Sequence, residues 1–151
     1  MARLNLINFL AFGFGLGYAK KAPGTFGTLA GIPFVLLFQH ASLEVYLLAT
    51  LLMGLFGVWL CGASSRQMGV HDHPGIVWDE IVGYMITMFA APSGWQWLLL
   101  GFVLFRFFDI LKPWPIGYLD RHVHGGLGIM LDDVVAGLMA AIVLQLIIYL
   151  F

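Results

Sequence analysis

Residues 130–150 read MLDDVVAGLMAAIVLQLIIYL. The stretch is long enough to cross a 30 Å hydrocarbon core, which needs about 20 apolar residues. Two adjacent carboxylates, Asp132 and Asp133, stand at its start. A charged side chain at bilayer depth costs about 2.5 to 3.5 kcal/mol on insertion scales, so acids beside an apolar span indicate a function. This stretch therefore predicts a membrane helix with chemistry at one end.

Four further apolar stretches precede this one, at about residues 25–39, 43–62, 77–91 and 95–111. Turn-forming Gly, Pro and Ser residues separate them. Residues 4–18 are also apolar but contain asparagines and glycines, which favours an interfacial helix. We expect an all-α integral membrane protein, a compact bundle of about four to five transmembrane or re-entrant helices with an N-terminal interfacial helix. All 151 residues form one domain in this interpretation.

The composition supports a membrane protein. Hydrophobic residues make up 61% of the chain and charged residues only 10%, against about 25% charged in soluble proteins. The formal net charge of −1 provides no basic field to attract nucleic acid. The single cysteine, Cys61, excludes an internal disulfide.

The distribution of charges predicts an orientation. If the five stretches alternate across a bilayer, all seven Lys and Arg residues fall on one face, which the positive-inside rule makes cytoplasmic. Every acid except Glu44 falls there too. Acids contribute little to orientation, so their gathering needs another reason. A polar site that faces the cytoplasm is the simplest one.

Residues 20–31, KKAPGTFGTLAG, form a basic, glycine-rich turn that leads into a helix. Free backbone N–H groups and the helix dipole favour a bound phosphate there, assisted by Lys20, Lys21, Thr25 and Thr28. The segment is not a P-loop, because its lysines precede its glycines. The alternative is structural: the lysines anchor the span to anionic lipid, while Gly27 and Gly31 form a helix-packing seam.

Two pairs of adjacent acids, Asp79–Glu80 and Asp132–Asp133, stand at the predicted cytoplasmic starts of two spans. Gly83 and Gly137 each follow an acid by four residues, so small side chains one turn away would let the two helices approach. Gathered carboxylates would repel each other without a hard divalent cation, so these four acids are candidate ligands of Mg²⁺. The alternative is that acids simply favour helix N-termini.

Arg106, Asp109 and Lys112 recur every three residues and therefore share one face of a helix end. The two cations suit phosphate oxygens, and Asp109 suits a metal ligand or proton acceptor. Intrahelical salt bridges, each worth about 0.2 to 0.5 kcal/mol, are the alternative. His71, Asp72 and His73 look like a metal motif but lie in a Gly/Pro loop with no third ligand nearby.

Four segments in order, residues 21–33, 78–83, 105–116 and 125–137, resemble the phosphatidylglycerophosphatase A family of bacterial membrane lipid phosphatases. The resemblance implies a magnesium-dependent hydrolase of phospholipid biosynthesis, which converts phosphatidylglycerophosphate to phosphatidylglycerol and phosphate. It also implies a multi-pass protein of the bacterial cytoplasmic (inner) membrane with its active site facing the cytoplasm. The charged clusters are the family's motif positions, which supports Asp79, Asp109 and Asp133 as catalytic residues.

Other phosphatase chemistries lack their residues. A cysteine phosphatase needs five residues between its cysteine and its arginine, whereas only four residues separate Cys61 from Arg66. The D-x-D segment of aspartyl-phosphate enzymes and the S-G-H segment of histidine-dependent lipid phosphatases are missing. Attack by water, assisted by magnesium, remains.

Two other classes of membrane protein are alternatives. A cation or proton transporter would spread its acids through the bilayer depth, whereas here they gather on one face. A metal-dependent lipid phosphotransferase of the CDP-alcohol type would carry a D-G-x-x-A-R segment, which this chain lacks.

Overall fold

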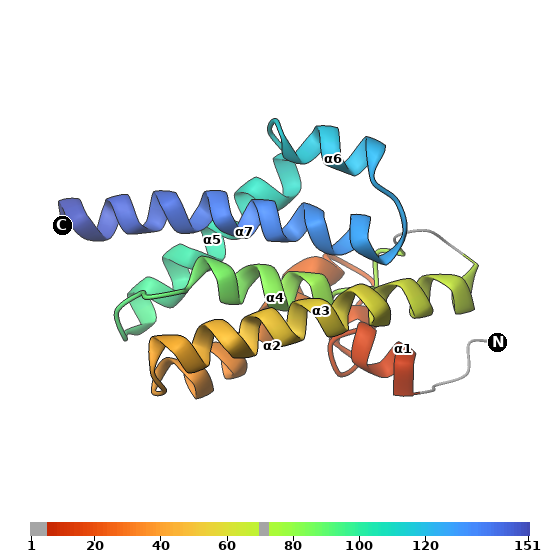
Figure 1. Cartoon of the computed structure of the whole chain (residues 1–151), viewed down its shortest axis with the longest axis horizontal. Coiled ribbons are helices and arrows are strands. Elements are labelled where there is room, and N and C mark those ends of the chain that lie inside the picture. Colours follow the sequence, from red (N-terminus) through yellow and green to blue (C-terminus); the bar gives the residue numbers. More distant parts are fainter. Residues whose placement is uncertain (1–5, 70–72) are drawn as a thin grey trace.

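The structure is a computed structural model that describes residues 6–69 and 73–151. These residues form helices and loops only. The helices are α1 (Leu6–Ala11), a 3-10 turn η1 (Leu16–Tyr18), α2 (Pro23–Gln39), α3 (Leu43–Met68), α4 (Trp78–Thr87), α5 (Trp95–Leu111), α6 (Ile116–His122) and α7 (Gly125–Leu150). Figure 1 shows α3 and α7 running along the long axis of the bundle, and the two helices pack against each other.

The helices α3 and α7 are each 26 residues long and apolar enough to cross a membrane, judged by length and composition alone. The Ser42 hydroxyl caps α3 by accepting a hydrogen bond from the Val45 N–H at 3.2 Å. Gly69 ends the helix in the left-handed region, with φ 68°. Both helices are longer than predicted: α3 continues past residue 62, and α7 begins five residues before residue 130.

The short helix α4 lies at the centre of the bundle and packs against α2, α3, α5 and α7. Eight of its ten residues are buried inside the protein. It has 10 residues, so it is about 15 Å long and does not fill the predicted stretch 77–91. The prediction of a spanning or re-entrant helix there is corrected to a short buried helix.

Glycines let α4 approach its neighbours closely. A Cβ added at Gly137 of α7 would lie 2.5 Å from the Gly83 carbonyl oxygen of α4, which leaves no room for a side chain. A Cβ at Gly27 of α2 would overlap Val77, and one at Gly31 would lie 3.1 Å from the Tyr84 ring. Both predicted glycine seams are therefore confirmed.

The N-terminal segment does not form the single interfacial helix predicted for residues 4–18, of which residues 4 and 5 lie outside the described part. Its helix α1 ends at Ala11, and positive φ angles at Gly13, Phe14 and Gly15 then turn the chain back. The Ala11 carbonyl accepts a hydrogen bond from the Val77 N–H at 2.8 Å. The segment is thus packed into the protein beside the start of α4.

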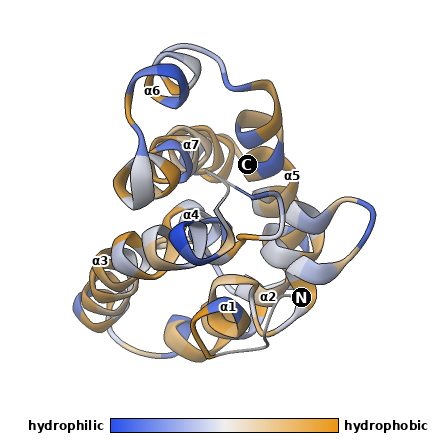
Figure 2. Ribbon diagram, turned by 90° about the vertical axis from the view of Figure 1, so that its right-hand side faces the viewer, coloured by the Kyte–Doolittle hydropathy of each residue, from blue (hydrophilic) through white to orange (hydrophobic). Residues whose placement is uncertain are grey.

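The polar residues gather at one end of the bundle. Figure 2 looks along the helices onto this end, where the hydrophilic first turn of α4 lies between hydrophobic neighbours. The N-terminal ends of α2, α4 and α7 and the C-terminal end of α5 surround a cavity here. The cavity therefore brings together charged residues of α4, α5 and α7, which are far apart in the sequence.

A candidate active site at the polar end

The cavity at the polar end has a volume of about 240 Å³. Its charged lining residues are Asp79 and Glu80 of α4, Arg106 and Asp109 of α5, Lys112 just after α5, and Asp132 and Asp133 of α7. The structure thus brings together both predicted acid pairs and the predicted face of α5. This combination of carboxylates and cations suits a metal ion beside a phosphate.

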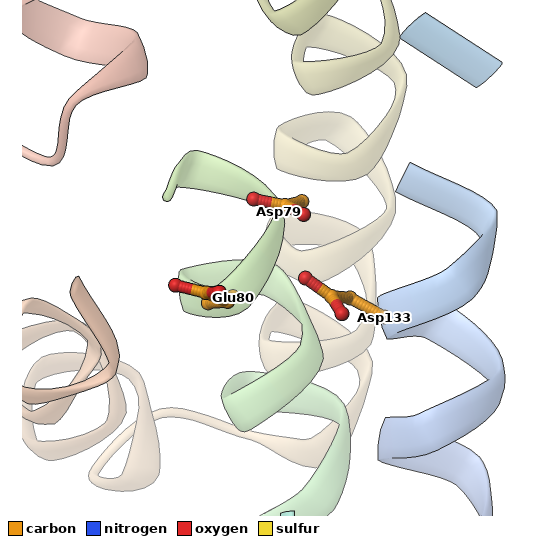
Figure 3. Close-up of side chains that lie close together, drawn as sticks. All are labelled: Asp79, Glu80 and Asp133. Atoms are coloured by element: carbon orange, nitrogen blue, oxygen red, sulfur yellow. The ribbon is translucent and has the colours of Figure 1, made fainter. Parts of the chain in front are cut away.

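Three acids form the tightest group in the cavity. Carboxylate oxygens of Asp79, Glu80 and Asp133 all lie within 4.8 Å of one another. Figure 3 shows Asp133 reaching from α7 toward Asp79 and Glu80 at the start of α4. The Oδ2 atom of Asp133 is buried and has no hydrogen-bond partner in the described part of the chain. Oxygen ligands at this spacing fit a hard divalent cation such as Mg²⁺.

The second acid of α7, Asp132, is buried and lines the cavity but does not belong to this group of three. The position of its helix also corrects a prediction. Because α7 begins at Gly125, Asp132 and Asp133 lie about two turns inside the helix rather than at its start. The dipole effect fades within the first turn, so it does not explain these two acids. Of the four paired acids, Asp79 and Glu80 stand in the first turn of their helix.

The side chain of Arg106 connects two helices. It pairs with Asp109 on its own helix and with Glu80 Oε1 of α4, whose distance from Nη1 is 3.7 Å. Of the predicted intrahelical salt bridges, the one between Arg106 and Asp109 is therefore present, and Arg106 also contacts a second helix. Gly24 of α2 makes room for it, since a Cβ there would lie 2.9 Å from Glu80 Oε1 and 3.0 Å from both terminal nitrogens of Arg106. The sequence analysis missed this role of Gly24.

Lys112 ends α5 with a left-handed backbone, φ 50°, and lines the cavity. Burial lowers the pKa of its ammonium group, but neighbouring carboxylates, led by Asp109 and Asp133, raise the pKa above its usual value overall. The lysine therefore stays charged at neutral pH. It supplies a fixed positive charge beside the acids.

The predicted phosphate-binding residues of the N-terminal cluster lie elsewhere. Lys20 and Lys21 are exposed, Thr25 is half-buried, and none of the three lines the cavity. The buried Thr28 hydroxyl donates a hydrogen bond to the Gly24 carbonyl oxygen at 2.7 Å. The start of α2 reaches the cavity through Pro23 and Gly24 instead. The two lysines precede α2, and their role in binding phosphate stays a prediction.

The loop before α4 also contributes to the cavity wall through His73, Pro74 and Ile76. His73 is the described member of the His71–His73 sequence, and His71 and Asp72 lie outside the described residues. The sequence feature that could have identified His73 as a lining residue is its position six residues before Asp79. No third metal ligand accompanied it, so the sequence analysis gave it no role.

Comparisons with known proteins identify the family of the chain. The sequence model of the family described as phosphatidylglycerophosphatase A matches residues 9–148. The chain belongs to this family. It is 49% identical over 150 residues to a phosphatidylglycerophosphatase A of Escherichia coli strain K12, with 97% of this chain and 87% of that protein covered. A protein of the same name from Haemophilus influenzae strain Rd is 52% identical over 142 residues, covering 93% of this chain and 87% of its own length. No solved structure matches the chain.

The resemblance inferred from four short segments is therefore confirmed across nearly the whole chain. Each segment contributes to the cavity: residues 21–33 through Gly24, residues 78–83 through Asp79, residues 105–116 through Arg106 and residues 125–137 through Asp133. The family is one of phosphoric monoester hydrolases, as its name states.

Proposed function

We propose that this chain hydrolyses phosphatidylglycerophosphate to phosphatidylglycerol and inorganic phosphate, in a magnesium-dependent step of phospholipid biosynthesis. One observation carries the proposal: a single cavity holds a cluster of three acids next to Arg106 and Lys112. Two relatives that cover nearly the whole chain are named for this activity. The alternative of a transporter is not favoured, because the clustered acids line a cavity at one end of the bundle.

Asp79, Glu80 and Asp133 are the proposed holders of Mg²⁺, with Asp132 beside them. When bound, the ion supplies a hard Lewis acid that offsets negative charge on phosphate oxygens. The close approach of α4 and α7 at Gly83 and Gly137 sets the separation of these carboxylates. The bundle thus prepares the acids for a cation that would also reduce their mutual repulsion.

The cations of α5 are proposed to bind the substrate phosphate. The planar guanidinium of Arg106 matches two phosphate oxygens, and Lys112 adds a point charge. Asp109 lies between them on the same helix face and is proposed to orient the attacking water and accept its proton. The water oxygen forms a bond to phosphorus, the bond from phosphorus to the glycerol oxygen breaks, and that oxygen takes a proton from solvent.

The membrane setting is part of the proposal. Large apolar side chains on α3 are exposed, including Leu51, Leu55 and Trp59, and so are Ile142 and Leu146 on α7. Exposed apolar surface on this scale is unusual for a soluble monomer and suits contact with lipid. The polar cavity would then lie near the cytoplasmic surface of a bacterial inner membrane, where the phosphate headgroup of a lipid is accessible.

Phosphate release from a defined lipid tests the proposal. The purified protein in detergent should release phosphate from phosphatidylglycerophosphate with magnesium, and should stop when a chelator is added. Phosphatidic acid, offered at the same concentration, measures how strictly the headgroup is selected. An absence of phosphate release from phosphatidylglycerophosphate, or equal release in chelator, would contradict the activity or its metal dependence respectively.

A further inference from the structure

His73 lies in the wall of the cavity but belongs to none of the four family segments that the site uses. Its half-buried ring packs against Phe12, with the ring centroids 5.4 Å apart. A Cβ at Gly75 would overlap the same Phe12 ring, so the loop approaches Phe12 closely on both sides of Pro74. The imidazole is therefore held by packing at the edge of a polar cavity. The ring nitrogens of this histidine are therefore candidate contacts for a ligand in the cavity.

The hydrogen bonds of the ring define its tautomer. The backbone N–H of Gly75 donates to His73 Nδ1 at 2.9 Å. A nitrogen that accepts a hydrogen bond carries no proton, so the neutral ring carries its proton on Nε2. Nε2 is then a donor and has no lone pair available for a metal ion. The Nε2–H group is therefore the donor that His73 can offer to a ligand in the cavity that it lines.

We propose that His73 Nε2–H donates a hydrogen bond to an oxygen of the substrate phosphate, so that His73 is a phosphate-binding residue. The inference rests on the proposed function and deepens it. The terminal nitrogen Nη1 of Arg106 already pairs with Asp109 and Glu80, so only part of the guanidinium is available to phosphate and a donor from another element adds to it. A neutral donor also contacts phosphate without adding another charged side chain to a cavity that already holds five acids and two cations. The loop before α4 thus contributes a donor that neither α5 nor α7 provides.

Two substitutions separate the roles of the ring nitrogens. In His73→Asn, the amide oxygen can replace Nδ1 and accept from Gly75, but nothing replaces Nε2. In His73→Gln, the longer side chain can place an amide N–H near the position of Nε2. We expect His73→Asn to lower kcat/KM by about 10- to 100-fold, as loss of a hydrogen bond to a charged group does, and His73→Gln to keep part of the activity. His40→Asn, an exposed histidine in the loop between α2 and α3, is the matched control and should keep full activity.

A binding measurement makes the test independent of turnover. Inorganic phosphate should raise the melting temperature of the wild-type protein, because a ligand of the folded state stabilises it. This shift should disappear in His73→Asn and partly return in His73→Gln. The shift caused by magnesium alone should stay in both variants, since His73 is not a metal ligand in this proposal. The melting temperature without ligand shows whether each variant is folded.

Three results would overturn the proposal. Wild-type kcat/KM and an unchanged phosphate shift in folded His73→Asn would make the histidine a structural residue. Loss of the magnesium shift in both variants would make it a metal ligand instead. No phosphate shift in the wild type would remove the phosphate contact itself. A wild-type protein that shows the phosphate shift but hydrolyses no phosphatidylglycerophosphate would contradict the proposed function and leave the role of His73 to be decided by binding.

Discussion

The Gly83 carbonyl of α4 and the Gly137 Cα of α7 are so close that a Cβ on Gly137 would lie 2.5 Å from the carbonyl oxygen. Each glycine lies one turn from an acid of the cluster, Gly83 from Asp79 and Gly137 from Asp133. The separation of the two helices and the separation of the two carboxylates are therefore linked. The geometry of the proposed metal site therefore depends on these two glycines as well as on the acids.

Gly137→Ala should separate α4 from α7 and disturb the acids. Replacing an exposed glycine within a helix by alanine usually stabilises a protein by about 0.5 to 1 kcal/mol. Here the new methyl group would instead collide with the Gly83 carbonyl oxygen. We expect a lower melting temperature, a smaller stabilisation by magnesium and lower turnover. Gly54→Ala on α3 is the control, since its Cβ would lie at an ordinary 3.6 Å from Val82. A fully active Gly137→Ala variant would show that the seam does not set the site.

Asp79→Asn and Asp133→Asn should each abolish most phosphate release while the protein stays folded. Each change removes an anionic oxygen ligand, so the magnesium concentration for half-maximal activity should rise, and high magnesium should partly rescue a single variant. Asp120→Asn on α6, outside the cavity lining, is the control. Wild-type turnover at low magnesium in either variant would remove that residue from the proposed metal site.

Arg106→Lys should lower turnover by about tenfold or more although the charge is kept, because the planar fork that matches two phosphate oxygens is lost. Lys112→Arg should have a milder effect, since a point charge is replaced by another cation. Phosphate-release kinetics and a thermal melt on both variants make the comparison. Unchanged kinetics in Arg106→Lys would leave only the salt bridges to Asp109 and Glu80 as its role.

Gly24→Ala should act on Arg106 from a different helix. The added methyl would come within 3.0 Å of the guanidinium nitrogens and 2.9 Å of Glu80 Oε1, so the ion pair must move. We expect turnover to fall while phosphate release still depends on magnesium. Lys20→Ala is a useful comparison, because that exposed side chain lies outside the cavity lining and its loss should leave turnover in detergent nearly unchanged. The reverse order of effects would restore the predicted phosphate site of the N-terminal cluster.

The proposed orientation can be checked by labelling single cysteines in a Cys61→Ser background. Positions 66 and 44 lie at opposite ends of α3, so a cysteine at Arg66 should react from the cytoplasm and one at Glu44 from outside. A cysteine at Arg121 should behave like the one at Arg66. Labelling of position 121 from the exterior would contradict the proposed topology.

Local features of this protein could be predicted from its sequence because they depend on residues close together in the chain. The α5 stretch ends as predicted at Leu111, and the spacing of three placed Arg106, Asp109 and Lys112 on the face that lines the cavity. Helix geometry alone also relates Asp79 to Gly83 and Asp133 to Gly137. The rest of the functional prediction was based on the resemblance of four short segments to a known family.

The tertiary structure decided which of these residues meet. Asp133 joins Asp79 and Glu80 while Asp132 stays outside the group, because that choice depends on the rotation of α7 against α4, which spacing along one helix does not define. Contacts between distant segments, such as Gly24 under Arg106 and His73 in the cavity wall, depend likewise on how helices and loops pack. The same packing leaves Lys20 and Lys21 outside the cavity. Sequence defined the chemical groups, and packing between helices defined their partners.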